Sequence, residues 1–294
     1  MELAALGSQI LSRMDSVQQR AGSGRGLAGY LPDANQVGVV AAVVLLTYAL
    51  TRLVNAPGIT LAIQLPGFYF TYPLTLGTAM TLIAAGLTAS GMDWLLHSHP
   101  GLARQRTMEH WLLPTLTAFI IGALLDILPS GPAWWVGFAV SAALLVSVLV
   151  AEYVALDPAA PLYPLASAGL IALSYALFLL LMIALRLGGA RLFLILPAVF
   201  LASGLVALRT LHLRLGRQWE FRWAVGIGLI CVQLGAGLHY WPLTSLQFGL
   251  LLLSPLYALT ALAARLGEDV PMRSALAEPA LILAGLWIAA ILLH

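Results

Sequence analysis

Long apolar runs alternate with short polar breaks from Asp33 to the end of the chain. A helix needs about 20 apolar residues to cross a hydrocarbon core about 30 Å thick. The pattern predicts nine such spans, at about 36–54, 73–91, 112–128, 134–155, 165–186, 192–211, 222–241, 244–264 and 276–293. The sequence therefore predicts an all-α, polytopic transmembrane helical bundle that occupies residues 33–294 as a single domain.

The first 32 residues depart from this pattern. Leu3, Leu6, Ile10 and Met14 recur at three- and four-residue spacing, which places them on one face of a helix. Such an amphipathic helix lies in the membrane interface, or it packs as a soluble helix against the end of the bundle. The glycine-rich string "AGSGRGLAGY" that follows is typical of a flexible linker.

The connection "ITLAIQLPGFYFTYPL" is rich in β-branched and aromatic residues and is divided by Pro66 and Gly67. This pattern predicts a short β-hairpin. Because the unpaired backbone of a hairpin is costly in open lipid, we expect it at the external membrane surface. A re-entrant segment is the alternative for residues 59–72.

The composition explains why the bilayer is the expected solvent. Hydrophobic residues make up 61% of the 294 residues and charged residues only 9%, with a mean hydropathy of +0.95. Soluble domains carry about 25% charged residues. A net charge of +2 without a dense basic stripe does not indicate nucleic-acid binding, and the single Cys231 cannot form an intrachain disulfide.

All the basic residues of the chain are arginines, and their distribution predicts the orientation. With nine spans and a cytoplasmic N-terminus, the external arginines are Arg52, Arg186 and Arg191. The eleven cytoplasmic arginines are then Arg13, Arg20, Arg25, Arg104, Arg106, Arg209, Arg214, Arg217, Arg222, Arg265 and Arg273. This asymmetry follows the positive-inside rule, and it places the C-terminus outside.

The elbow "MDWLLHSHPGLARQRTMEHW" gathers Asp93, His97, His99, Glu109 and His110 between two spans. Imidazole and carboxylate groups are ligands for zinc or iron, so these five residues are the candidates for a metal or acid–base site. No HExxH motif is present. We expect instead a solvated elbow in which the polar residues reach water, with no metal and no cofactor.

Four polar residues fall inside or at the ends of predicted spans: Asp126, Glu152, Gln233 and His239. An ionised group at the centre of a membrane helix costs roughly 2.5–3.5 kcal/mol on insertion scales. We therefore expect Asp126 and Glu152 to face the bundle. They lie at opposite membrane surfaces and are not expected to pair, whereas Glu152 can pair with an arginine of the cytoplasmic cluster.

The string "LRTLHLRLGRQWEFRW" holds Arg209, Arg214, Arg217 and Arg222 beside two tryptophans. Arginine and tryptophan together are typical of a membrane interface. We interpret the four arginines as a surface that faces lipid headgroups or a partner, and an ordinary positive-inside loop explains them as well.

Four short strings occur together: "SHP" at 98–100, "WLLP" at 111–114, "AEY" at 151–153 and "WPL" at 241–243. In these strings the chain resembles an uncharacterised family of multi-spanning bacterial membrane proteins, known as a domain of unknown function, from about residue 40 to the end. The resemblance implies a location in the bacterial cytoplasmic membrane. It implies no reaction and no catalytic residues.

Three hypotheses for the function follow. The first is a non-catalytic scaffold or complex subunit, whose partners are membrane lipids and another membrane protein. The second is a small-solute or lipid carrier, with a polar cavity lined by Glu152, Gln233 and Asp126. The third is a metal-dependent membrane enzyme centred on residues 93–110.

The orientation is testable with topology reporters. Because arginine-rich loops stay in the cytoplasm, reporters fused after Arg106 and after Arg217 are expected to read cytoplasmic, and a reporter after Ser130 external. An external reading at both arginine loops would reverse the orientation.

Overall fold

The computed structural model describes residues 31–54, 58–65, 68–98, 108–158, 160–215, 219–268 and 270–293. Within these residues it forms nine helices that are long and apolar enough to cross a membrane, which confirms the predicted bundle. The helices are α2 Ala34–Leu53, α3 Leu76–His97, α4 Met108–Ile127, α5 Pro132–Val154, α6 Tyr163–Leu187, α7 Leu192–Arg214, α8 Phe221–His239, α9 Ser245–Gly267 and α10 Met272–Leu292.

The helix ends follow from local sequence signals. Pro132 occupies the first turn of α5, where its missing N–H costs nothing, and Gly131 before it has a φ of 139° that favours glycine. At the start of α9, the Thr244 side chain accepts from the Gln247 backbone and the Gln247 side chain accepts from the Thr244 N–H. This capping box satisfies two helix-end donors.

The elbow is shorter than the hydropathy pattern predicts. α3 continues to His97 rather than ending near residue 91, and α4 begins at Met108 rather than near 112. Asp93 and His97 are therefore one helical turn apart, and the Nδ1 atom of His97 lies 2.7 Å from the Asp93 carbonyl oxygen. Hydropathy marks where apolar composition ends, whereas the helical backbone continues into the polar region.

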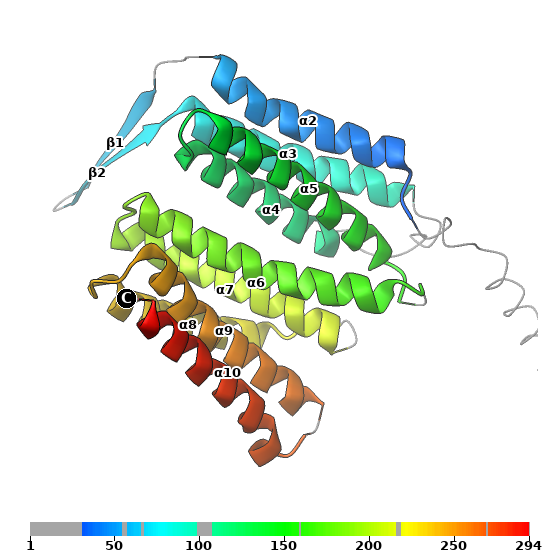
Figure 1. Cartoon of the computed structure of the whole chain (residues 1–294), viewed down its shortest axis with the longest axis vertical. Helices are drawn as coiled ribbons and strands as arrows, with labels where there is room; N and C mark the ends of the chain where they lie inside the picture. Colours follow the sequence, from blue (N-terminus) through cyan, green and yellow to red (C-terminus); the bar gives the residue numbers. More distant parts are fainter. Residues whose placement is uncertain are drawn as a thin grey trace, which may run out of the picture.

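The predicted β-hairpin is present. β1 (Ile59–Leu65) pairs antiparallel with β2 (Phe68–Leu74), with Ile59 opposite Leu74 and Leu65 opposite Phe68. Figure 1 places the hairpin beyond the ends of α2 and α3, outside the helical bundle rather than re-entering it. The expected amphipathic helix and linker lie outside the described residues, apart from residues 31 and 32.

The helices form two packed groups, α2–α5 and α6–α10, which lie one above the other in Figure 1. α4 and α5 lie at the interface between the two groups, the seam, because neighbouring side chains on each of these helices enter different hydrophobic cores. On α4, Ile120 enters the core of the second group and Ile121 that of the first. On α5, Val148 and Leu149 divide in the same way.

The helices alternate in direction, so the bundle has two distinct ends. The elbow end is where α3 ends and α4 begins, and α5, α7 and α9 also end there. The hairpin end is where β1 and β2 lie, and α4, α6 and α8 end there. Alternating helices therefore bring residues distant in sequence to the same end.

Small residues permit close helix contacts, as is usual where lipid offers no hydrophobic drive for association. Gly122 of α4 lies so close to Thr81 of α3 that an added Cβ atom would clash with that side chain. Gly86, also on α3, has open space instead. The α3–α4 interface therefore depends on the missing side chain at Gly122.

These two glycines make a matched pair for mutation. Gly122→Ala is expected to lower the free energy of unfolding by about 1–3 kcal/mol through overpacking. Gly86→Ala is expected to be neutral or to stabilise by up to about 1 kcal/mol, because alanine is the better helix former. Thermal unfolding in detergent measures both, and equal effects of the two substitutions would contradict the close contact.

Candidate functional site

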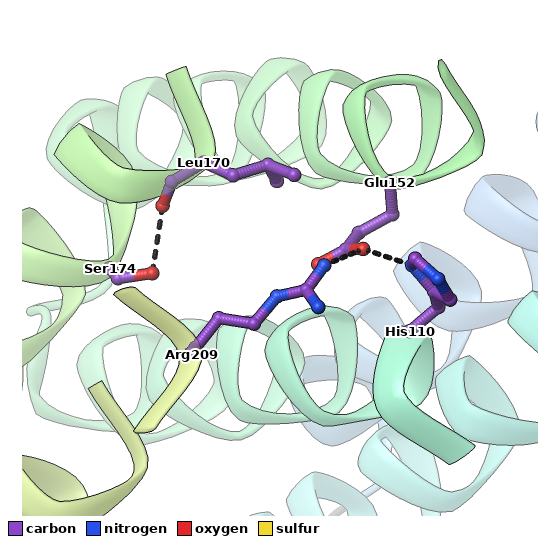
Figure 2. Close-up of polar contacts among 5 residues, drawn as sticks. All are labelled: His110, Glu152, Leu170, Ser174 and Arg209. Carbon is purple, nitrogen blue, oxygen red and sulfur yellow. Dashed lines mark hydrogen bonds and ion pairs between the residues drawn. The ribbon is translucent and has the colours of Figure 1, made fainter. Parts of the chain in front are cut away.

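A buried ion triad lies near the elbow end, where Glu152 of α5 lies between His110 of α4 and Arg209 of α7 (Figure 2). His110 is in the first turn of α4, and Glu152 is in the last turn of α5. Arg209 lies within the last two turns of α7. Because α4 runs away from the elbow end and α5 and α7 run toward it, the three side chains reach the same depth.

All three side chains are withdrawn from the surface. Glu152 is 0% exposed, and His110 and Arg209 are each 2% exposed. The Nδ1 atom of His110 lies 2.8 Å from Glu152 Oε2, and Arg209 Nη2 donates to the same oxygen. One carboxylate oxygen therefore joins three helices.

Charge balance explains why the triad forms. A single ionised side chain among apolar helices is costly, and arginine remains protonated under all ordinary conditions. Glu152 supplies the opposite charge to Arg209, and an ionised carboxylate can only accept hydrogen bonds. The Nδ1 atom of His110 is therefore the donor of its bond to Glu152.

The triad has unused hydrogen-bonding capacity. Within the described part of the chain, no partner is found for Glu152 Oε1, for His110 Nε2 or for Nε and Nη1 of Arg209. A void of about 10 Å³ is lined by Arg209 and Ser174, among others. That is about the room that one water molecule needs, but the void is lined mostly by leucine and valine and does not touch Glu152 or His110.

The triad also connects the two helix groups. α4 and α5 pack with the first group, whereas α7 lies in the second. Breaking a buried ion pair by removing one partner costs about 3–5 kcal/mol. The ion triad thus acts as a clamp that holds the two helix groups together across the seam.

Of the elbow candidates whose side chains the structure describes, Asp93 and His97 lie together, and His110 lies apart from them against Glu152. Asp93 and His97 form a partly exposed pair, with 3.6 Å between His97 Nδ1 and Asp93 Oδ2. His99 and the side chain of Glu109 lie outside the described residues. Among the side chains that the structure describes, no three His, Cys, Asp or Glu residues are placed to hold a metal ion.

His110 corrects the expectation of a solvated elbow. It is buried against Glu152, because α4 begins four residues earlier than predicted and its first turn faces α5. Sequence reasoning missed this pair, although the predicted topology placed both residues at the cytoplasmic ends of their spans. The predicted pairing of Glu152 with an arginine of the basic stretch is present.

Arg209 corrects a second expectation. It was expected to face lipid headgroups or a partner with Arg214, Arg217 and Arg222, but its side chain is buried. Arg214 and Arg222 are exposed, and Arg217 lies outside the described residues. Because a helix turns 100° per residue, Arg209 and Arg214 lie about 140° apart around α7.

Asp126 lies in the last turn of α4, where it is exposed but turns its side chain toward the neighbouring helix α3. Its carboxylate lies over the first turn of α3, where an added Cβ on Gly77 would clash with it. The N-terminal end of a helix carries a partial positive charge, which accounts for a carboxylate at this place.

The remaining polar residues lie on α8. His239 is half-buried at the hairpin end, where its ring packs edge-on against Tyr240 at a centroid distance of 5.4 Å. Gln233 is exposed within the span and has no hydrogen-bond partner among the described residues. It shares an open face with Ile230, Gly226 and Gly237, and an added Cβ on either glycine would meet nothing within 4 Å.

The family model for a protein of unknown function (DUF5656) matches residues 56–293. The chain belongs to the DUF5656 family. The matched region contains all three residues of the triad, and it confirms the resemblance to a family of unknown function. No curated protein and no solved structure matches the chain.

In this DUF5656 chain, Arg209→Gln is expected to lower the free energy of unfolding by about 3–5 kcal/mol, because Glu152 stays buried without its cation. The double variant Glu152→Gln, Arg209→Gln removes both charges and is expected to be more stable than the single variant. Unfolding in detergent measures both variants.

Arg214→Gln, an exposed arginine on the same helix, is the control and is expected to change stability by less than about 1 kcal/mol. Equal losses for Arg209→Gln and Arg214→Gln would refute the clamp.

Proposed function

We propose that this multi-pass membrane protein is a non-catalytic scaffold or complex subunit of the bacterial cytoplasmic membrane, with a cytoplasmic N-terminus and an external C-terminus. Membrane lipids surround it, and a transmembrane helix of another membrane protein docks on α8. The observation that carries this proposal is the exposed Gln233 within an apolar span.

An amide group that faces lipid lacks hydrogen-bond partners, and burying an unpaired polar group costs on the order of 2–7 kcal/mol. Gln233 lies three residues from the middle of α8, at a depth where water does not compensate the amide. A helix that carries its own amide or hydroxyl group would satisfy both partners. Hydrogen bonds of this kind contribute about 1 kcal/mol to helix association in membranes.

The surroundings of Gln233 suit such a partner. Gly226 and Gly237 leave the α8 backbone open on the same face, one on each side of the amide. Small residues let helix backbones approach closely. The partner we propose is therefore a transmembrane helix with a polar side chain opposite Gln233 and small residues around it.

The same residues give no support to a carrier with the expected lining. Glu152 is enclosed in the ion triad, Gln233 points away from the bundle, and Asp126 is exposed at the hairpin end. These three side chains do not share a cavity. A rigid clamp inside the bundle and an open polar face outside it favour docking over passage of a solute.

Photo-cross-linking tests the proposal. A photoreactive phenylalanine analogue replaces Ile230, which lies one turn from Gln233 on the exposed face of α8. We expect cross-links to one transmembrane helix of a single partner, mapped by mass spectrometry to a site near an amide or hydroxyl side chain. Gln233→Leu is expected to reduce that product about fivefold, as the loss of roughly 1 kcal/mol implies.

The same analogue at Leu281, an exposed position on α10, is the control, and its products are expected not to respond to Gln233→Leu. Cross-links from position 230 to lipid alone, or a product unaffected by Gln233→Leu, would rule out the proposed docking face.

A further inference from the structure

A second polar feature lies at the hairpin end, in a pocket of about 290 Å³. It is lined by residues from the end of α2, the α4–α5 connection and the start of α5, namely Ala49, Arg52, Leu53, Ser130, Trp134 and Trp135. Arg52 is the cation of this pocket, and its guanidinium lies 5.2 Å from the ring centroid of Trp134. The pocket is distinct from the ion triad, which lies at the opposite end.

Arg52 is held in place by three acceptors at the end of α4. Its Nη1 donates to Ser130 Oγ at 3.1 Å, and its Nη2 donates to the carbonyls of Leu125 and Leu128 at 3.2 and 2.8 Å. A guanidinium has five N–H groups, so two remain unused. Within the described residues Arg52 forms no ion pair, and the carboxylate of Asp126 lies over α3 instead.

The start of α5 adds a second feature that suits an anion. Gly131 is the N-cap residue and lines the pocket, and α5 has no side-chain cap. The backbone N–H groups at a helix start carry partial positive charge and bind phosphate readily. Pro132 has no N–H and the Trp134 and Trp135 N–H groups donate to the Gly131 carbonyl, so the Ala133 N–H is the donor that this helix start can offer. The pocket therefore combines the Arg52 cation, a hydroxyl group and one backbone N–H at a helix start.

We infer that this pocket binds the phosphate group of an anionic phospholipid. Arginine matches phosphate oxygens through its planar fork, and Ser130 supplies a hydroxyl group beside it. Leu53 and Trp135 are 78% and 64% exposed at the rim, where they can contact the acyl chains. Tryptophan at the ends of membrane helices is typical of the headgroup level.

The second helix group supplies a natural comparison. Arg186, in the last turn of α6, donates to the carbonyls of His239 and Trp241 at the end of α8 and lies 5.4 Å from the ring centroid of Phe248. This repeats the way in which Arg52 binds the end of α4. The adjacent helix, α9, has its N-terminus closed by the capping box at Thr244. Arg186 therefore shares the helix-end contacts of Arg52 without the uncapped helix N-terminus.

Native mass spectrometry of the purified full chain tests the site. Delipidated protein is reloaded with phosphatidylglycerol or with zwitterionic phosphatidylcholine of the same chain length. The wild type is expected to retain one phosphatidylglycerol about tenfold more strongly than phosphatidylcholine, because both carry the phosphate but the quaternary ammonium of choline would lie beside the Arg52 cation. Arg52→Gln is expected to abolish this preference, and Arg186→Gln to leave it unchanged.

Ser130→Asp places a negative charge at an exposed position of the pocket. This variant tests the lipid preference if Arg52→Gln does not fold. It is also expected to abolish the preference. Equal retention of the two lipids by the wild type, or an equal loss in Arg52→Gln and Arg186→Gln, would overturn the inference. Displacement by inorganic phosphate alone would also overturn it, because the site would then take a soluble anion rather than a lipid.

Discussion

The fold depends on the requirement that a carboxylate among apolar helices must meet a cation. Glu152 satisfies it through Arg209, with His110 as a second donor to the same oxygen. Because the three residues come from α4, α5 and α7, this one contact fixes the relative depth of three helices. It also joins the two helix groups, which otherwise associate through side-chain packing in a solvent as apolar as the side chains.

At the hairpin end, arginines bind the backbone carbonyls at helix C-termini rather than a carboxylate. Helix C-termini leave backbone carbonyls without partners, and Arg52 and Arg186 each bind the carbonyls at the end of a neighbouring helix. Each arginine also lies over an aromatic ring of the helix that follows. The two helix groups thus use equivalent arginines as helix-end contacts, whereas the ion triad lies across the seam between them.

The sequence predicted the elements better than the faces on which their residues lie. Nine spans and the hairpin follow from one-dimensional signals, namely apolar length and a Pro-Gly turn between β-branched and aromatic runs. The sequence does not predict which face of each helix is buried, because a helix surrounded by lipid is apolar on all sides and carries no amphipathic period. His110 and Arg209 were therefore assigned to the correct ends of their helices but to the wrong environments.

The distribution of polar groups supports the proposed docking role over the role of a conduit. A conduit places its polar side chains along the interior, where a solute passes, and leaves its outer surface apolar. In the described part of this chain, Glu152 and Arg209 balance each other inside the bundle and are shared among packed helices. The amide of Gln233 lies instead on the outer surface of α8, within the span. The amide of Gln233 is thus a polar group on the outer surface that a neighbouring transmembrane helix could bind, which supports the proposed docking.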